Sequence, residues 1–173
     1  MKKILALVLA LVMMLGTVAL AEGEIKIGQV QFAAHGNKCF AVITAVVQDG
    51  VIVAAHIDEY QYLAADSNIG VPNSDTGLAS YVTEGYVLGS KRVNNETYSN
   101  NMATKAGATQ QLVAGYTAIE TFAVGKTVAE LEAAIEGKTS ADMLAEVDAV
   151  STCTLVDTLG YLQGIVAAAK AAE

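Results

Sequence analysis

The chain of 173 residues has no tryptophan, one proline and two cysteines, and its 10 lysine and arginine residues are outnumbered by 18 aspartate and glutamate residues. Two cysteines are too few to build a fold from disulfide bridges. The shortage of basic residues excludes the positively charged surface that nucleic-acid binding needs. The hydrophobic content of 53% excludes a disordered chain. The composition therefore predicts a folded, acidic domain that does not bind nucleic acid.

The first residues have the three parts of a secretory signal. A basic start, Met1–Lys3, precedes the apolar run Ile4–Leu15, and small residues follow at Ala19–Ala21. This pattern predicts a signal peptide over residues 1–21 and a single domain over residues 22–173, located outside the bacterial cytoplasm. The alternative is that the apolar segment is retained as a membrane anchor, because it carries no charge. The domain that follows has no run long enough to cross a membrane, so we expect a secreted protein of the cell envelope.

The two cysteines, Cys39 and Cys153, lie far apart in the sequence. Outside the cytoplasm the conditions are oxidising, and a bridge between them would close a long loop and stabilise the fold. The alternative is two buried thiols, which the apolar neighbours of Cys39 favour. The sequence leaves both possibilities open.

The first third of the domain predicts a meander of three strands, Glu24–Ala34, Cys39–Gln48 and Val51–Tyr60. Asp49–Gly50 between two apolar runs is typical of a type I′ hairpin, because both central residues of that turn need positive φ. In the first strand the apolar residues change parity, which predicts a bulge near Gly28–Gln29. The second strand is apolar on both faces, so we expect it in the centre of the sheet.

Polar and turn-forming residues then predict a long loop over Gln61–Thr83, which is followed by a short strand over Tyr86–Leu88. Long loops in small domains often carry function, although a plain surface loop is the simpler interpretation.

The rest of the chain has helical periodicity. One helix is expected after an asparagine cap at residue 94 or 95, and a second over Leu112–Ala123. Thr127–Glu130 has the pattern of a capping box that begins a third helix. An apolar stripe from Leu155 to Ala169 predicts a last helix packed on the sheet. Strands first and helices afterwards predict an α+β fold, an antiparallel β-meander of three to five strands packed against C-terminal helices.

Residues with catalytic chemistry are scarce. No serine or cysteine stands in a recognisable nucleophile motif with a base, and the two histidines lack the spacing of a zinc site. We therefore expect no enzymatic machinery of the chain's own. Lys91 and Arg92 precede a predicted helix, and cations beside a helix N-terminus can bind an anion. The simpler interpretation is that this pair serves only solubility.

Two stretches carry a resemblance to a known family. The hairpin Asp49–Ala55 and the segment Asp148–Thr154, which precedes the last predicted helix, together resemble the bacterial extracytoplasmic FMN-binding domain. The phrase Gly125–Leu131 is similar to small secreted members of clostridial type. The family occurs in flavin subunits of membrane redox complexes, and in it an Asp-x-x-Ser-Gly-Ala-Thr motif precedes the terminal helix.

The resemblance implies a flavin site at that motif. Asp148, Ser151 and Thr154 match it, and in the family a flavin transferase can esterify the last threonine to the phosphate of FMN. Thr152 and Cys153 replace the family's Gly and Ala, which argues against covalent attachment in this chain.

If FMN binds, the resemblance implies that its phosphate lies near Thr154, and we expect Lys91 or Arg92 to contribute charge. Tyr60, Tyr62 and Tyr86 are candidates to cover the flavin ring. The chemistry would then be electron transfer by the cofactor. Two alternatives stay open. In the first, the only role of Thr154 is to cap the N-terminus of the last helix. The whole protein would then be a cofactor-free surface protein that binds a cell-wall component or a protein partner through the 61–83 loop.

Overall fold

The computed structural model describes residues 23–76, 78, 84–151 and 155–173. Its elements follow one another in the order β1 (Ile25–Phe32), β2 (Cys39–Gln48), β3 (Val51–Ala64), β4 (Tyr86–Ser90), α2 (Asn95–Ala106), α3 (Leu112–Ala123), α4 (Val128–Ile135), α5 (Ser140–Ser151) and α6 (Thr158–Ala172).

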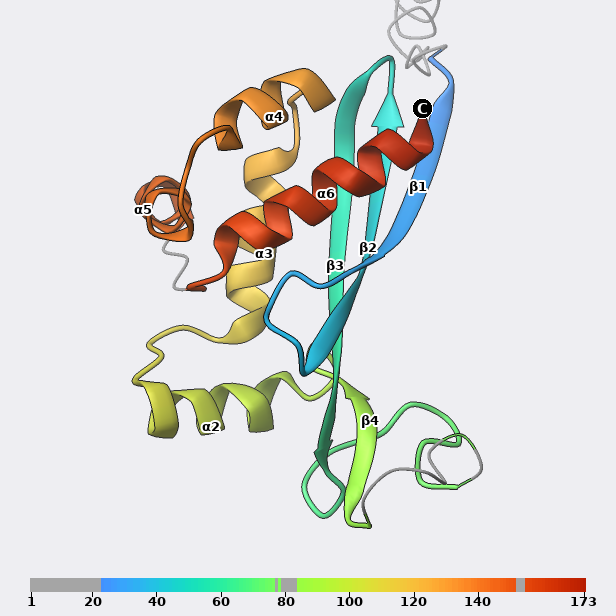
Figure 1. Cartoon of the computed structure of the whole chain (residues 1–173), viewed down its shortest axis with the longest axis vertical. Helices are drawn as coiled ribbons and strands as arrows, with labels where there is room; N and C mark the ends of the chain where they lie inside the picture. The colour runs from blue at the N-terminus through green and yellow to red at the C-terminus, as the bar shows by residue number, and fades with distance from the viewer. Residues whose placement is uncertain (1–22, 77, 79–83, 152–154) are drawn as a thin grey trace, which may run out of the picture.

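The four strands form one antiparallel sheet in the order β1-β2-β3-β4. Helix α6 lies across β1 and β2, α3 packs on β3, and α4 and α5 pack against α6 (Figure 1). These helices cover the same side of the sheet. The predicted α+β meander with C-terminal helices is therefore confirmed, and β2 lies in the interior of the sheet as expected.

The first hairpin has the predicted turn. Asp49 has φ of 52° and Gly50 has φ of 78°, the signs that a type I′ turn requires. The bulge, however, was predicted in the wrong strand. The pairing of β1 with β2 is regular throughout, and the irregularity lies between β2 and β3 beside Val46 and Val47. The change of parity in β1 needs no bulge. Ile27 simply points away from the helices and is 68% exposed, so it does not belong to the core.

The core lies between the sheet and the helices. Ile43 and Ile57 contribute from the strands, and Ile119, Leu162 and Ile165 from α3 and α6, all with no exposed surface. Each strand contributes alternate residues to this core, so its remaining side chains lie on the uncovered side of the sheet.

The last helix begins later than predicted. Asp157 is the N-cap of α6, and residues 155–157 form a turn in which Thr158 donates its N–H to the carbonyl of Leu155 over 3.2 Å. Thr158 also donates its hydroxyl to the same carbonyl. Because the helix begins after Asp157, the prediction that Thr154 caps the last helix is wrong. Thr154 itself lies outside the described residues.

Other boundaries differ in the same way. Strand β3 continues to Ala64, and β4 to Ser90, so the long connection begins at residue 65. Helix α5 was not predicted. The capping box at Thr127 and Glu130 is confirmed. Asn94 is the N-cap of α2, but its side chain bonds to both backbone polar groups of Ile69 instead of capping the helix. In the described part of the chain, no helix combines the length and the apolar character needed to cross a bilayer.

Candidate functional site

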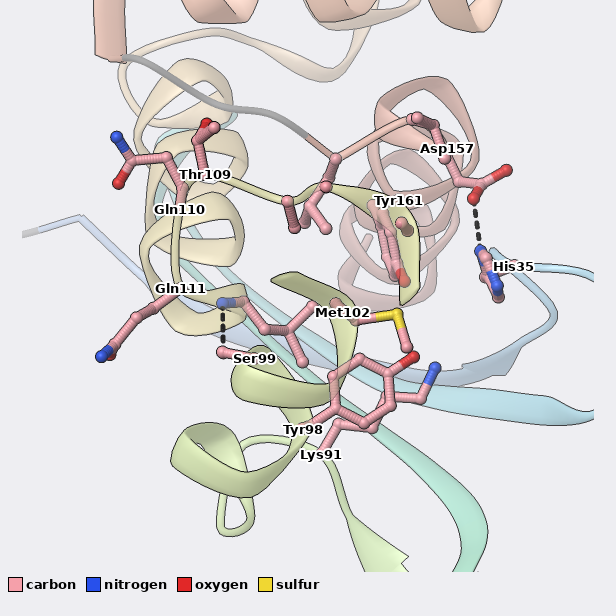
Figure 2. A pocket seen from close by; sticks show the side chains of 16 residues that line it. His35, Lys91, Tyr98, Ser99, Met102, Thr109, Gln110, Gln111, Asp157 and Tyr161 are labelled. Carbon is pink, nitrogen blue, oxygen red and sulfur yellow. Dashed lines mark hydrogen bonds and ion pairs between the residues drawn. The ribbon is translucent and has the colours of Figure 1, made fainter. Parts of the chain in front are cut away.

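A cleft of about 280 Å³ lies between α2, the connection that follows it and the start of α6. We call it the α2–α6 cleft. Figure 2 shows lining residues from these three segments, with Tyr98, Met102 and Tyr161 grouped around the cleft. The lining comprises His35, Lys91, Tyr98, Ser99, Met102, residues 106–112, residues 155–157 and Tyr161. This volume is close to the lower limit of small-molecule pockets, which suits one fused ring system.

The walls of the cleft are largely apolar. Tyr98 and Met102 project from successive turns of α2, and Leu112 and Leu155 also line the cleft. Ser99 connects α2 to the start of α3, because its hydroxyl accepts the N–H of Leu112 over 3.0 Å. An apolar cleft with a few fixed polar groups is the usual form of a site for a flat organic ligand.

A buried ion pair lies beneath the cleft. Lys91, just after β4, extends its Nζ to within 2.5 Å of Oε2 of Glu59 on β3, and the exposed fractions of the two side chains are 2% and 0%. The Lys91 ammonium also lies 4.9 Å from the centre of the Tyr98 ring. Burial by itself would lower the pKa of Lys91, but the charge of Glu59 and its hydrogen bond raise that pKa above its ordinary value. Lys91 is therefore a cation at neutral pH, and Glu59 neutralises it.

Two tyrosines complete the shell of that carboxylate. Tyr161 and Tyr116 donate their hydroxyls to Oε2 of Glu59 over 3.0 and 3.3 Å, and their rings meet edge to face at 5.3 Å. Burial is the main cause that raises the pKa of both phenols far above the ordinary value, and the charge of Glu59 adds to it. Both groups therefore remain protonated donors, and the part of Tyr161 that lines the cleft is held in place.

Cys39 lies on the remaining side of Glu59. Its thiol is 3.3 Å from Oε1 of Glu59 and 2.8 Å from the carbonyl oxygen of His35. Burial and, next, the charge of Glu59 raise the pKa of Cys39 to about 11. A thiol with this pKa is a poor nucleophile at neutral pH. Cys153 lies outside the described residues, so the possible bridge between the two cysteines stays a prediction.

A second polar pair, His35 with Asp157, lies in the lining of the cleft. Nδ1 of His35, in the β1–β2 turn, pairs with Oδ2 of Asp157, the N-cap of α6 (Figure 2). The two side chains are 45% and 33% exposed. This contact connects the beginning of the sheet with the start of the last helix, and it leaves both ionisable lining groups at this end of the cleft paired.

Arg92 turns away from the cleft and serves the edge of β3. Its Nε donates to the carbonyl of Ile57 over 2.8 Å, and its Nη2 lies 2.6 Å from Oε1 of Glu120 on α3. The same Glu120 oxygen accepts the N–H of Ile57 over 2.7 Å. The two side chains thus bond to the N–H and the carbonyl of Ile57. They replace a neighbouring strand at a point of β3 that β4 does not reach.

The predicted ring-covering tyrosines gather elsewhere. Tyr60, Tyr62 and Tyr86 have the strand positions that place their side chains on the side of the sheet opposite the helices. Tyr60 stacks on Phe40 there, with 5.6 Å between ring centres. The structure therefore brings these three residues to one surface but does not bring them to Lys91 or to the start of α6.

The motif residues are only partly described. Asp148 is an exposed residue of α5, and Ser151 is the last residue of that helix. Thr154 lies outside the described residues, although the next residues in the chain, 155–157, line the cleft. Lys91 therefore lines the same cleft as the three residues that follow the motif in the chain, whereas Arg92 lies at a different site.

Sequence reasoning missed Glu59, Tyr98 and Tyr161. Glu59 could have been found, because it shares strand parity with the buried Ile57 and so stands at a core-facing position, where a carboxylate needs partners. The two tyrosines carry no such signal, since an aromatic residue on a helix is typical of any core.

Comparison with protein families, with curated proteins and with solved structures finds no match. Within the described residues no group of three or more histidine, cysteine, aspartate or glutamate side chains could hold a metal ion.

Proposed function

We propose that this protein is an extracytoplasmic flavin-binding module that holds FMN without a covalent bond and that has no catalytic residues of its own. One observation carries the proposal. The segment that resembles the family's FMN motif leads directly into residues 155–157, and these line the α2–α6 cleft. The flavin would supply electron transfer, and the protein would bind and shield its ring.

The cleft suits the ring of a flavin. Tyr98, Met102 and Leu155 offer flat and apolar surfaces, and the volume of about 280 Å³ accommodates one fused ring system. The Tyr161 phenol is fixed by Glu59, so this part of the floor is ordered before a ligand arrives. Binding would therefore cost little side-chain entropy.

The phosphate of FMN fits the described residues less well. Lys91 is neutralised by Glu59, and Arg92 is paired with Glu120 at the sheet edge. Among the described lining residues of the cleft, no unpaired cation is left for a phosphate. In the proposed complex the phosphate is therefore not held by these described cations, and the resemblance implies that it lies near Thr154.

The test is flavin titration of the exported protein, followed by flavin fluorescence, together with its intact mass after co-expression with a flavin transferase. We expect unmodified mass and saturable FMN binding. Replacing Tyr98→Ala should weaken FMN binding by roughly 2- to 10-fold, the range of one aromatic contact. The matched control is Tyr62→Ala, which removes an exposed ring far from the cleft.

Absence of saturable binding would refute the proposal. A loss of affinity in Tyr62→Ala with none in Tyr98→Ala would move the flavin to the other side of the sheet. Urea unfolding of both variants shows whether any lost affinity comes from lost structure.

A second candidate function is a cofactor-free surface protein that binds a cell-wall component. The supporting observation is a hollow of about 330 Å³ in the loop after β3, with polar side chains at Asn68, Asn73 and Asp75. Amide and carboxylate groups of this kind suit a hydroxyl-rich polymer. Replacing Asn68→Ala together with Asp75→Ala should then reduce retention on purified cell wall, whereas Tyr98→Ala should not. Unchanged retention would remove this candidate.

A further inference from the structure

The side of the sheet opposite the helices carries exposed apolar side chains from all four strands. We call this surface the open face. Ile25 and Ile27 are 62% and 68% exposed, and Tyr62 and Tyr86 at the far end are 46% and 49% exposed. Phe40 lies between them with 37% exposure. The register of the strands places all five on one surface.

The open face is almost without charge. Asp58 is its only carboxylate among the described strand residues, and this group accepts a hydrogen bond from Ser90 over 2.6 Å. Gln29 and Thr44 bond to each other across β1 and β2 over 3.0 Å. The full chain has a formal charge of −8, so two copies repel each other through most of their surfaces. The open face is where this repulsion is weakest, and the two polar pairs just named are already hydrogen-bonded within it.

The size of the face fits a weak, specific contact. The four strands have 8, 10, 14 and 5 residues, and at about 3.3 Å per residue and about 4.8 Å between strands they cover on the order of 500 to 600 Å². Two such faces in contact would bury on the order of 1,000 Å² in total, which is the lower limit for a specific interface. For a contact of this size we expect a dissociation constant in the micromolar range.

We propose that two copies of this chain pair through their open faces. The contact is isologous, so the two four-stranded sheets stack face to face as in a β-sandwich, with the helices on the outside. Association buries Ile27 and the exposed tyrosines. This pairing is independent of the cleft, which opens on the helical side of the sheet.

The test is sedimentation equilibrium of the exported protein over the micromolar range, at low and at high salt. We expect a monomer–dimer equilibrium that becomes stronger as salt rises, because salt screens the repulsion between two acidic chains. Ile27→Glu should raise the dissociation constant ~10-fold or more, since each dimer would bury two new carboxylates. Tyr62→Glu, at the opposite end of the face, should act in the same direction.

Val93→Glu is the matched control, because Val93 is similarly exposed (63%) but follows β4 and lies off the open face. It should leave the dissociation constant unchanged. Near-ultraviolet circular dichroism of each variant reports whether the fold is retained. A protein that remains monomeric throughout the range overturns the proposal, as does equal weakening by Val93→Glu. A monomer that loses cell-wall retention only in Ile27→Glu would assign the open face to a wall polymer instead.

Discussion

Lys91 and Glu59 form an ion pair of 2.5 Å in a place where neither side chain reaches solvent. The pair joins the end of β4 to the middle of β3, and it lies directly beneath the α2–α6 cleft. Tyr116 and Tyr161 bring α3 and α6 to the same carboxylate. One acidic residue in a strand thus connects the sheet to two helices and to the cleft floor.

Removing one partner of this pair should destabilise the protein strongly. Lys91→Met leaves the Glu59 carboxylate buried without a counter-charge, and we expect a loss of about 3 to 5 kcal/mol in the free energy of unfolding. Urea unfolding followed by circular dichroism measures it. A double variant, Lys91→Met with Glu59→Met, should recover part of the loss, because no charge is then left in the core.

The matched control is Lys138→Met, which breaks the ion pair with Glu146 between side chains that are each 40% exposed. Its unfolding midpoint should hardly move, because solvent screens such pairs. If Lys91→Met and Lys138→Met lowered the free energy of unfolding equally, burial of the Lys91–Glu59 pair would make no difference to stability.

The Cys39 thiol should ionise about two pH units above an ordinary cysteine, because burial and the Glu59 charge raise its pKa to about 11. In a Cys153→Ser background, the logarithm of the alkylation rate with iodoacetamide should keep rising with pH up to about pH 10. A small peptide thiol is the control, and its rate levels off near its own lower pKa. Levelling at the same pH in the protein would contradict the buried, Glu59-facing position of the thiol.

The sign of the linked stability follows from the same shift. A raised pKa in the folded state stabilises the fold below the unfolded pKa, and this contribution is lost as the pH rises through about 11. Unfolding measured between pH 8 and pH 11 should therefore show a larger loss of stability in the Cys153→Ser protein than after an additional Cys39→Ala replacement.

Some features of this fold could be predicted from a few adjacent residues, and others could not. Asp49–Gly50 and Thr127–Glu130 were predicted correctly because each is a complete motif within four residues, with its partners adjacent in the chain. The start of α6 could not be found in that way. An apolar stripe continues through Leu155 and Leu159, and it carries no sign of the turn in which Thr158 bonds to the carbonyl of Leu155 before the helix begins.

The candidate site was less accessible to prediction because its parts come from distant segments. Glu59, Lys91 and Tyr161 meet only after the sheet and the last helix have packed. Lys91 and Arg92 are adjacent in the sequence, and either was expected to contribute charge to an anion site, with a role in solubility alone as the simpler interpretation. The backbone after β4 turns one side chain into the core and the other to the edge of β3, so neighbours in sequence have separate roles.

Arg92 should protect the edge of β3. In Arg92→Ala the carbonyl of Ile57 loses its partner and Glu120 loses its counter-charge. We expect a loss of about 2 to 3 kcal/mol at pH 7, measured by urea unfolding. Burial already raises the pKa of Glu120 above its ordinary value, against the opposing effects of the Ile57 N–H and Arg92, and removing Arg92 raises that pKa further.

A carboxylate with a raised pKa in the folded state stabilises the fold at low pH and loses this contribution as the pH rises. The loss in Arg92→Ala should therefore be smaller at pH 4, where Glu120 can take up a proton. A loss of equal size at pH 4 and pH 7 would show that the ion pair contributes nothing beyond the bond to Ile57. Arg92→Lys is the conservative comparison, and it should retain the charge but not the donation to the carbonyl of Ile57.

The packing of α6 on β1 should depend on the missing side chain of Gly28. A Cβ at this position would overlap the backbone carbonyl of Ala168 and crowd the backbone nitrogen of Ala172. The helix cannot relieve such an overlap by rotating a side chain, so it must move away from the strand. Gly28→Ala should therefore cost about 1 to 3 kcal/mol in urea unfolding, with faster hydrogen exchange in α6.

Gly164→Ala is the matched replacement within α6 itself. There the added Cβ would meet the terminal methyl of Ile43 and the ring edge of Phe32, which are side-chain atoms that can shift. Alanine also favours helix over glycine by about 1 kcal/mol, which offsets part of the crowding. We therefore expect Gly164→Ala to lose less stability than Gly28→Ala. The reverse order would mean that α6 is held mainly by side-chain packing on β2, and that its close backbone approach to β1 is not needed for the fold.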